Sequence, residues 1–176
     1  EDEINETPTL ALASVNVAPS PVLNNDINKL RLAIAEIAGV SGSNIKFKIQ
    51  YSQVSDFSSG VFDVVEKGSC VSNSQWCYGE GTDSDDDPIT TRKLPDTTAS
   101  GTHNESGVSA STYDPAASTS TEYEFTLKMA GAPANTVYFF RAFDTTNNSP
   151  VSLNTDESYP SVVTGGTELT FSISGI

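Results

Sequence analysis

Acidic residues gather in one short segment of the chain, residues 80–88, with the sequence EGTDSDDDP. Within it Asp83, Asp85 and Asp87 alternate, so their carboxylates can converge on one hard cation. Ca²⁺ is bound by about six to eight oxygens, mostly from carboxylates and carbonyls. The segment lacks the glycine and the glutamate that complete an EF-hand loop. These three aspartates are therefore a candidate Ca²⁺ site, and a solvated acidic loop is the interpretation that we favour.

The two cysteines, Cys70 and Cys77, lie close together in the chain. In an acidic sequence rich in Ser and Thr, this spacing favours a local disulfide that closes a loop, and two free thiols are the alternative. A zinc site would need further Cys or His ligands, and His103 is the only histidine. A catalytic triad would also have to use His103, which has no nucleophile-elbow motif near it. The residues therefore predict no catalytic site.

Two aromatic residues, Trp76 and Tyr78, flank Cys77. A loop closed by a disulfide can present such rings to sugars or to a protein partner. The alternative, which we favour, is that Trp76 fills the edge of the hydrophobic core.

Three sequons for N-glycosylation occur, at Asn5, Asn104 and Asn147. Pro150 follows the third sequon and should hinder its use. Short matches of this kind arise by chance in a chain rich in Asn, Ser and Thr. A glycan on any of them would support a role at an extracellular surface.

Alternation of apolar and polar residues predicts the elements that must position these groups. It is clearest in residues 44–51, where Ile45, Phe47, Ile49 and Tyr51 share one face. Residues 61–66 and 168–174 are further strand candidates, and residues 136–145 read as a strand buried on both faces. A further strand is predicted from Glu122 onward. Its inward-facing residues are Tyr123, Phe125, Leu127 and Met129, and its outward-facing residues are Glu122, Glu124, Thr126 and Lys128.

The segment of residues 27–37 fits two kinds of element. Ile27, Leu30, Ile34 and Ile37 follow a helical spacing, and local propensity favours a helix. Leu30, Leu32 and Ile34 equally fit a strand. We predict a strand, because every clear neighbour is a strand. About seven short strands with turn residues between them indicate an all-β sandwich.

Three parts of the chain have distinct predicted roles. Residues 1–22 form an N-terminal arm and linker, residues 23–176 form the sandwich, and residues 68–120 form a long inserted loop with little structure of its own. The arm has an acidic start, then an apolar stretch, and prolines at its end. Its apolar residues, the candidate donor strand, are Leu10, Leu12, Val15 and Val17.

One segment carries a family resemblance. Residues 130–142, with the sequence AGAPANTVYFFRA, resemble the corner between strands E and F of fibronectin type III domains. Residues 44–52, 101–107 and 159–161 resemble patterns in fibronectin-III-like modules of bacterial surface proteins. The resemblance implies an immunoglobulin-like β-sandwich in which Tyr138 is the corner tyrosine, its hydroxyl bonded to backbone a few residues upstream. The inserted loop makes this chain larger than a minimal domain of that type.

Charge and composition limit the classes of partner. The chain has 176 residues, and 23 acidic against 9 basic residues give it a net charge of −14. A polyanion of this kind repels nucleic acid and anionic membranes. No apolar run is long enough for a transmembrane helix. The chain begins with Glu1, which fits removal of a signal peptide and predicts an extracellular or cell-surface location.

The arm leads to the functional prediction. It can pair with its own sheet as an ordinary first strand, or it can complete the sheet of a neighbouring copy, which is donor-strand complementation. The second arrangement predicts a structural subunit of an extracellular filament, pilus or surface assembly, a head-to-tail polymer of identical copies. The alternative is an adhesive or carbohydrate-binding module of a larger surface protein, with surface glycans as partners. Apart from Ca²⁺, no cofactor is predicted.

Overall fold

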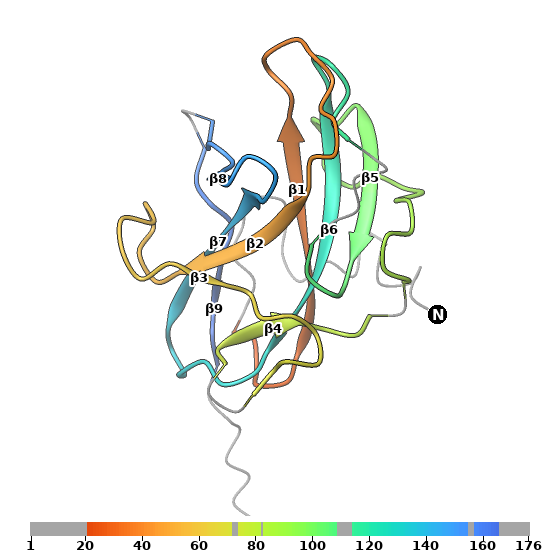
Figure 1. Ribbon diagram of the computed structural model, residues 1–176. Helices are drawn as coiled ribbons and strands as arrows, with labels where there is room; N and C mark the ends of the chain where they lie inside the picture. Colours follow the sequence, from red (N-terminus) through yellow and green to blue (C-terminus); the bar gives the residue numbers. More distant parts are fainter. Residues whose placement is uncertain (1–20, 72–73, 82, 109–113, 155–156, 166–176) are drawn as a thin grey trace, which may run out of the picture.

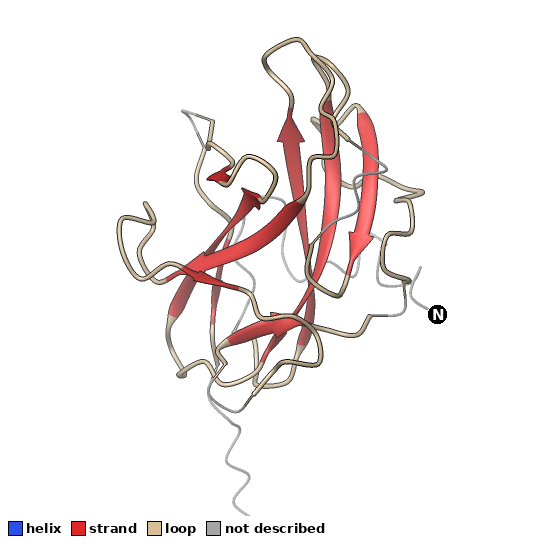
Figure 2. Cartoon of the chain, viewed as in Figure 1, coloured by secondary structure: helices blue, strands red, loops and turns tan. Residues whose placement is uncertain are grey.

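The computed structural model describes residues 21–71, 74–81, 83–108, 114–154 and 157–165, and these form two packed β-sheets (Figure 1). No helix occurs within these ranges (Figure 2). The prediction of an all-β sandwich is therefore confirmed. The described part of the chain contains no helix with the length and apolarity that a membrane crossing requires. Leu10, Leu12, Val15, Val17 and the predicted strand at 168–174 lie outside the described residues.

The first sheet is built around its longest strand, β6 (Ser120–Met129). β1 (Ile27–Ala35) pairs antiparallel with β6 along one side. On the other side of β6, β4 (Trp76–Tyr78) pairs antiparallel near the C-terminal end. β5 (Ala99–Asn104) pairs parallel with the N-terminal half of β6. Both β4 and β5 belong to the inserted segment, so the prediction that this segment has little structure of its own is wrong.

The second sheet is centred on β7 (Val137–Asp144). β2 (Phe47–Ser52) pairs antiparallel with β7, and the short β3 (Phe62–Asp63) pairs with the outer side of β2. On the other side of β7 lie β8 (Ser149–Pro150) and β9 (Ser161–Val163), both antiparallel. The side chains of β7 that face the core are buried and the others are only partly covered, so the prediction of burial on both faces of this strand is wrong.

The core lies between the two sheets, as the alternation predicts. Trp76 is 1% exposed, and its ring lies edge-on to the rings of Tyr138 and Phe140 at 5.8 Å and 5.0 Å. Packing of this kind stabilises the fold through burial and aromatic contact. The inward-facing residues come from β1, β2, β4, β6 and β7 and include Ile34, Phe47, Ile49, Tyr51, Tyr78, Tyr123, Phe125, Leu127 and Met129.

Residues 27–35 form a strand, which confirms that choice over a helix. Every residue of β1 has a partner in β6, from Ile27 opposite Lys128 to Ala35 opposite Ser120. Leu30 and Leu32 pack against the core cluster from this strand. A short helix alone in water is marginal, so pairing and burial across a whole strand outweigh the local helical preference.

The outward-facing side of β6 differs from the prediction. Glu122 and Glu124 are 0% and 1% exposed, and Thr126 is 1% exposed, although all three were expected to face solvent. The inserted segment lies over this face and covers them. At Gly101, β5 lies so close to β6 that an added Cβ would be 2.7 Å from the Glu122 carbonyl oxygen and from the Tyr123 ring. Periodicity gives the side on which a residue projects and says nothing about what covers that side.

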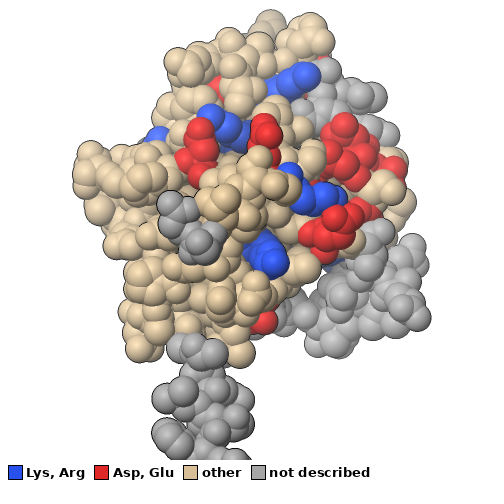
Figure 3. Space-filling model, turned by 60° about the horizontal axis from the view of Figure 1, so that its bottom comes forward, with Lys and Arg blue, Asp and Glu red and all other residues tan. Residues whose placement is uncertain are grey.

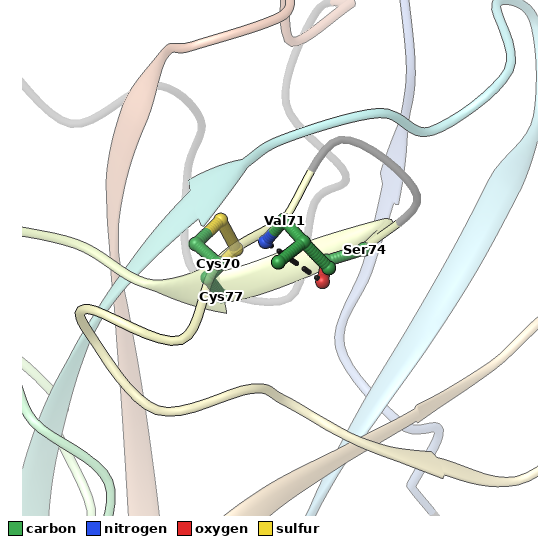
Figure 4. The surroundings of a disulfide bond; sticks show 4 residues. All are labelled: Cys70, Val71, Ser74 and Cys77. Atoms are coloured by element: carbon green, nitrogen blue, oxygen red, sulfur yellow. Dashed lines mark hydrogen bonds between the residues drawn. A yellow bond between two sulfur atoms is a disulfide. The ribbon is translucent and has the colours of Figure 1, made fainter.

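A disulfide joins Cys70 to Cys77, with the two Cα atoms 5.8 Å apart (Figure 4). Inside the closed loop, the N–H of Val71 donates to the hydroxyl of Ser74 at 3.3 Å. Cys77 lies in β4 and is 0% exposed, so the bond ties an exposed loop to the first sheet. The N–H of Val65 also donates to the carbonyl of Trp76 at 3.1 Å, which connects the chain leaving the second sheet to β4.

Candidate functional site

The outward face of the first sheet holds a group of charged and titratable side chains, which we call the ionic cluster. Strand pairing positions its centre, because Arg31 of β1 lies directly opposite Glu124 of β6. Lys29 and Glu122 each lie two residues away along their own strand and therefore on the same face. β5 and the acidic segment complete it from the other side. Its members are Lys29, Arg31, Asp83, His103, Glu122 and Glu124.

Glu122 is the anchor for the inserted segment. Its carboxylate accepts a hydrogen bond from Nη1 of Arg31 at 2.5 Å. It also accepts backbone N–H bonds from Lys93 at 3.0 Å and Leu94 at 2.8 Å, and the hydroxyl of Thr97 lies 3.3 Å away. A fully buried carboxylate is tolerated only when it is paired and hydrogen-bonded in this way. These bonds hold residues 93–97 against the sheet.

Glu124 lies at the centre of the ionic cluster. Nε of Arg31 donates to one of its oxygens at 2.6 Å, and Nδ1 of His103 and Nζ of Lys29 lie 2.8 Å and 3.1 Å from the other. Burial by itself raises the pKa of a carboxyl group. The hydrogen bond with His103 and the charges of Arg31 and Lys29 outweigh burial and lower the pKa of Glu124 to about 2. Glu124 is therefore a carboxylate at all ordinary pH values.

Lys29 lies between two carboxylates. Its ammonium group donates to Asp83 and lies 3.1 Å from Glu124. Burial on its own lowers the pKa of Lys29, but the hydrogen bonds to Asp83 and Glu124 outweigh it and raise the pKa. On the face drawn in Figure 3, Lys and Arg side chains likewise lie next to Asp and Glu side chains.

One group in the described ranges has the spacing of a metal site: ligand atoms of Asp83, His103 and Glu124 lie within 4.8 Å of one another. The ammonium of Lys29 already lies against both carboxylates of this group, so the cluster carries its own cation. The predicted Ca²⁺ ligands bond to different partners. Asp85 accepts the N–H of Glu105 at 2.7 Å, and the backbone carbonyl of Asp87 accepts the N–H of His103 at 2.8 Å.

His103 lies on β5 with 4% of its surface exposed. The backbone N–H and C=O of His103 bond to Asp87 and Asp86, so the acidic segment runs alongside β5 as β5 runs alongside β6. Its ring meanwhile bonds to Glu124 on β6. The arrangement acts chemically as a set of buried ion pairs that fastens the inserted segment to β1 and β6.

The predicted aromatic residues lie inside the sandwich. Trp76 and Tyr78 are 1% and 2% exposed, which is the core position that we favoured for Trp76. The hydroxyl of Tyr78 accepts the N–H of Ile49 at 2.8 Å, which joins β4 to β2.

Tyr138 is also buried, but its hydroxyl accepts a hydrogen bond from Nε2 of Gln53 at 3.2 Å. This partner is a side chain, whereas a corner tyrosine bonds to backbone a few residues upstream.

The sequons differ in accessibility. Asn104 is 0% exposed, and its amide nitrogen donates to the carbonyls of Thr102 at 2.9 Å and Glu124 at 3.0 Å. Asn147 is exposed, and Asn5 lies outside the described residues. Because a glycan attaches through the amide nitrogen, we expect Asn104 to be unmodified in folded protein made in a glycosylating host. Peptide mapping by mass spectrometry measures occupancy at each sequon, and a glycan on Asn104 would contradict its buried position.

The sequence reasoning missed Lys29, Arg31, Glu122 and Glu124 as one group. A signal was present, because two cations spaced by two residues and two acids with the same spacing match when their strands pair. Comparisons with protein-family models, with characterised proteins and with solved structures found no match to this chain.

Proposed function

We propose that this chain is a structural subunit of an extracellular filament, pilus or cell-surface assembly, in which the N-terminal arm of one copy completes the first sheet of the next. The observation that carries the proposal is the position of β1. β1 is nine residues long, and none of the described strands lies along the side that faces away from β6. A long edge strand of this kind is normally covered, because its backbone offers hydrogen bonds to any extended chain.

The strand order supports an immunoglobulin-like reading of this position. In that fold one sheet has the order A-B-E-D and the other contains C, F and G. In the first sheet, β1 fits B, β6 fits E, and the side formed by β4 and β5 fits D. In the second sheet, β2 fits C, β7 fits F and β9 fits G. The position beside β1 is then that of strand A, and residues 1–20 are the part of the chain that precedes β1 and can fill it.

The point at which the arm leaves the sandwich favours a neighbour over the same copy. The N–H of Val22 donates to Val163 at 2.9 Å, and its carbonyl accepts the N–H of Gly165 at 2.7 Å. These bonds hold residue 22 beside the second sheet, whereas the acceptor position lies along the first. An arm that pairs with its own β1 must cross between the sheets, and one that extends to a neighbour need not. Residues 1–20 span at most about 66 Å at about 3.3 Å per residue, enough to reach another copy.

Burial would supply the free energy of each junction. At about 25 cal/mol per Å² of apolar surface, burying a few side chains such as Leu10, Leu12, Val15 and Val17 contributes several kcal/mol, in addition to a row of backbone hydrogen bonds. The net charge of −14 on each copy opposes association. Salt screens such repulsion, so assembly should strengthen as ionic strength rises.

Electron microscopy of the intact chain and of a chain lacking residues 1–20 tests the proposal. We expect regular filaments from the intact chain, more of them at higher salt, and only monomers from the shortened chain. Leu12→Asp, which places a charge in the apolar stretch, should prevent assembly, whereas the matched change Ile4→Asp in the acidic start should not. Monomers from the intact chain under all conditions would overturn the proposal.

A photoreactive residue at Ala33 separates the two ways in which the arm can pair. Ala33 is an exposed residue of β1, so a crosslinker there reaches a strand alongside β1 in any register. Donation to a neighbour gives a ladder of covalent multimers on a denaturing gel. Pairing within one copy gives only a crosslinked monomer, which would contradict strand donation.

One observation favours the binding-module alternative. Phe62 is 56% exposed and its ring stacks on Tyr51 with centroids 5.7 Å apart. Both residues line a pocket together with Gln53 and Gln75. The exposed ring of Phe62 offers a surface on which a sugar can stack, so monomers in the assembly experiment would direct the search to glycans at this pocket.

A further inference from the structure

The contact between Lys29 and Asp83 joins an amine to a carboxyl group across two distant parts of the chain. Lys29 lies on β1, and Asp83 lies in the inserted segment 54 residues later. Their side chains are 19% and 22% exposed, so both are largely shielded from water. A third group is within reach, because Oε1 of Glu124 lies 3.1 Å from Nζ of Lys29. An amine, a carboxyl group and a buried carboxylate thus meet at one point.

These three groups are those that amide formation requires. In water an amine and a carboxylic acid do not condense to a useful extent, since both are ionised and water competes. Two groups held in contact by a fold react with effective concentrations that reach about 10⁵–10⁸ M. A neighbouring carboxylate can also move the proton that must leave the nitrogen.

We propose that Nζ of Lys29 and Cγ of Asp83 become joined by an intramolecular amide bond, with Glu124 as the group that transfers the proton. Glu124 suits this role because it is 1% exposed and held in place by Arg31 and His103. The bond would tie the first strand covalently to the inserted segment. With the disulfide Cys70–Cys77, the insertion would then be fastened to the first sheet at two covalent points.

The step balances without a co-reactant. The proton in the hydrogen bond between Lys29 and Asp83 moves from nitrogen to oxygen, which gives a neutral amine and a neutral acid. The nitrogen lone pair attacks Cγ of Asp83, and the nitrogen passes a proton to Glu124. Glu124 returns that proton to the departing hydroxyl, the C–O bond breaks, and one water molecule leaves. No atom changes oxidation state, and Glu124 ends as it began.

The same contacts make the expected reaction slow. They raise the pKa of Lys29, so the neutral amine is a minor form at any moment. An amide in a shielded position hydrolyses very slowly, and product therefore accumulates. We expect freshly made protein to be a mixture and aged protein to be fully joined.

Intact-mass spectrometry of the reduced, denatured protein tests the proposal directly. We expect aged wild-type protein to be lighter than its sequence mass by one water molecule. Lys29→Arg keeps the positive charge but should retain its full mass. Lys29→Arg also controls for other losses of water from the chain, because it leaves those reactions intact.

Two further variants make the assignment specific. Asp83→Asn should react with loss of ammonia in place of water and reach the same final mass as the wild type, whereas Asp83→Ala should stay at full mass. Peptide mapping should recover one branched peptide that contains Lys29 and Asp83. An aged wild-type protein at its full mass, or a branched peptide that joins Lys29 to Glu124, would overturn the proposal. The wild-type measurement needs no variant to fold.

Discussion

Glu122→Ala is expected to lower the free energy of unfolding by about 3–5 kcal/mol, as removal of one partner from a buried ion pair does. Glu122 is 0% exposed and accepts bonds from Arg31, Lys93 and Leu94. The shortened side chain leaves a largely buried guanidinium without this carboxylate, and two backbone N–H groups lose their acceptor. Urea unfolding followed by the fluorescence of Trp76, the only tryptophan, measures the change.

Two other variants make the result specific to the buried group. Glu122→Gln keeps an oxygen that can accept hydrogen bonds but removes the charge, so its loss should be smaller than that of Glu122→Ala. Glu80→Ala removes an acid that is 73% exposed and pairs with Lys67 at the surface, and its loss should be much smaller still. Equal losses for Glu122→Ala and Glu80→Ala would show that the ionic cluster does not hold the insertion.

Local stability of the insertion should fall more than that of the core. The bonds of Glu122 hold residues 93–97, whereas the core residues on the other face of β6, such as Phe125, pack between the sheets. Hydrogen exchange in Glu122→Ala should therefore increase first at Leu94 and Thr97. Exchange that increases equally in β2 and β7 would indicate global unfolding.

The sheets follow from the sequence where one face is apolar. Ile49 and Tyr51 alternate with polar residues in β2, and Tyr123 and Phe125 do so in β6, so both strands are evident from side-chain period alone. β1 is harder to predict, because Leu30 and Ile34 fit both the period of a helix and the period of a strand. The other clear strands favour a strand here, since a strand beside β6 buries its apolar residues against the same core.

β5 shows why the sequence does not reveal the strands of the inserted segment. Its sequence, ASGTHN, has no apolar alternation and little β propensity. It becomes a strand because the side of β6 opposite β1 offers backbone bonds, and because Gly101 allows a close approach to Tyr123. Both causes lie outside the segment, so no window of local sequence contains them.

The ionic cluster has the same non-local origin. Arg31 and Glu124 are 93 residues apart, and only the pairing of β1 with β6 brings them together. The charge pattern on each strand is visible in the sequence, but an exposed and a buried version of that pattern look alike. The difference comes from the insertion, whose path over the sheet depends on the cluster itself.

Acid should destabilise the protein through Glu124 over a defined range of pH. The pKa of Glu124 is about 2 in the folded chain, against an ordinary value of 4.5. A group whose pKa is lower in the folded state stabilises that state above the unfolded pKa, and this contribution is lost as pH falls through the folded pKa. Stability should therefore decline between about pH 5 and pH 2, by about 3 kcal/mol from this group.

The variant Glu124→Gln isolates this effect from that of the other acids. The comparison is made in a shared Asp83→Ala background, in which the proposed amide cannot form and Lys29 keeps its charge. Glu124→Gln removes the titrating group and keeps the shape of the side chain, so it should be less stable than the protein with Glu124 at pH 7 and should lose less stability on acidification. The difference in unfolding free energy between the two proteins, measured in urea at several pH values, should therefore shrink as pH falls from about 5 to 2. Other acids such as Glu36 and Asp56, whose pKa values are lowered by hydrogen bonds, are the same in both proteins and cancel in the difference. Parallel curves for the two proteins would mean that Glu124 is not held as a carboxylate by Arg31, Lys29 and His103.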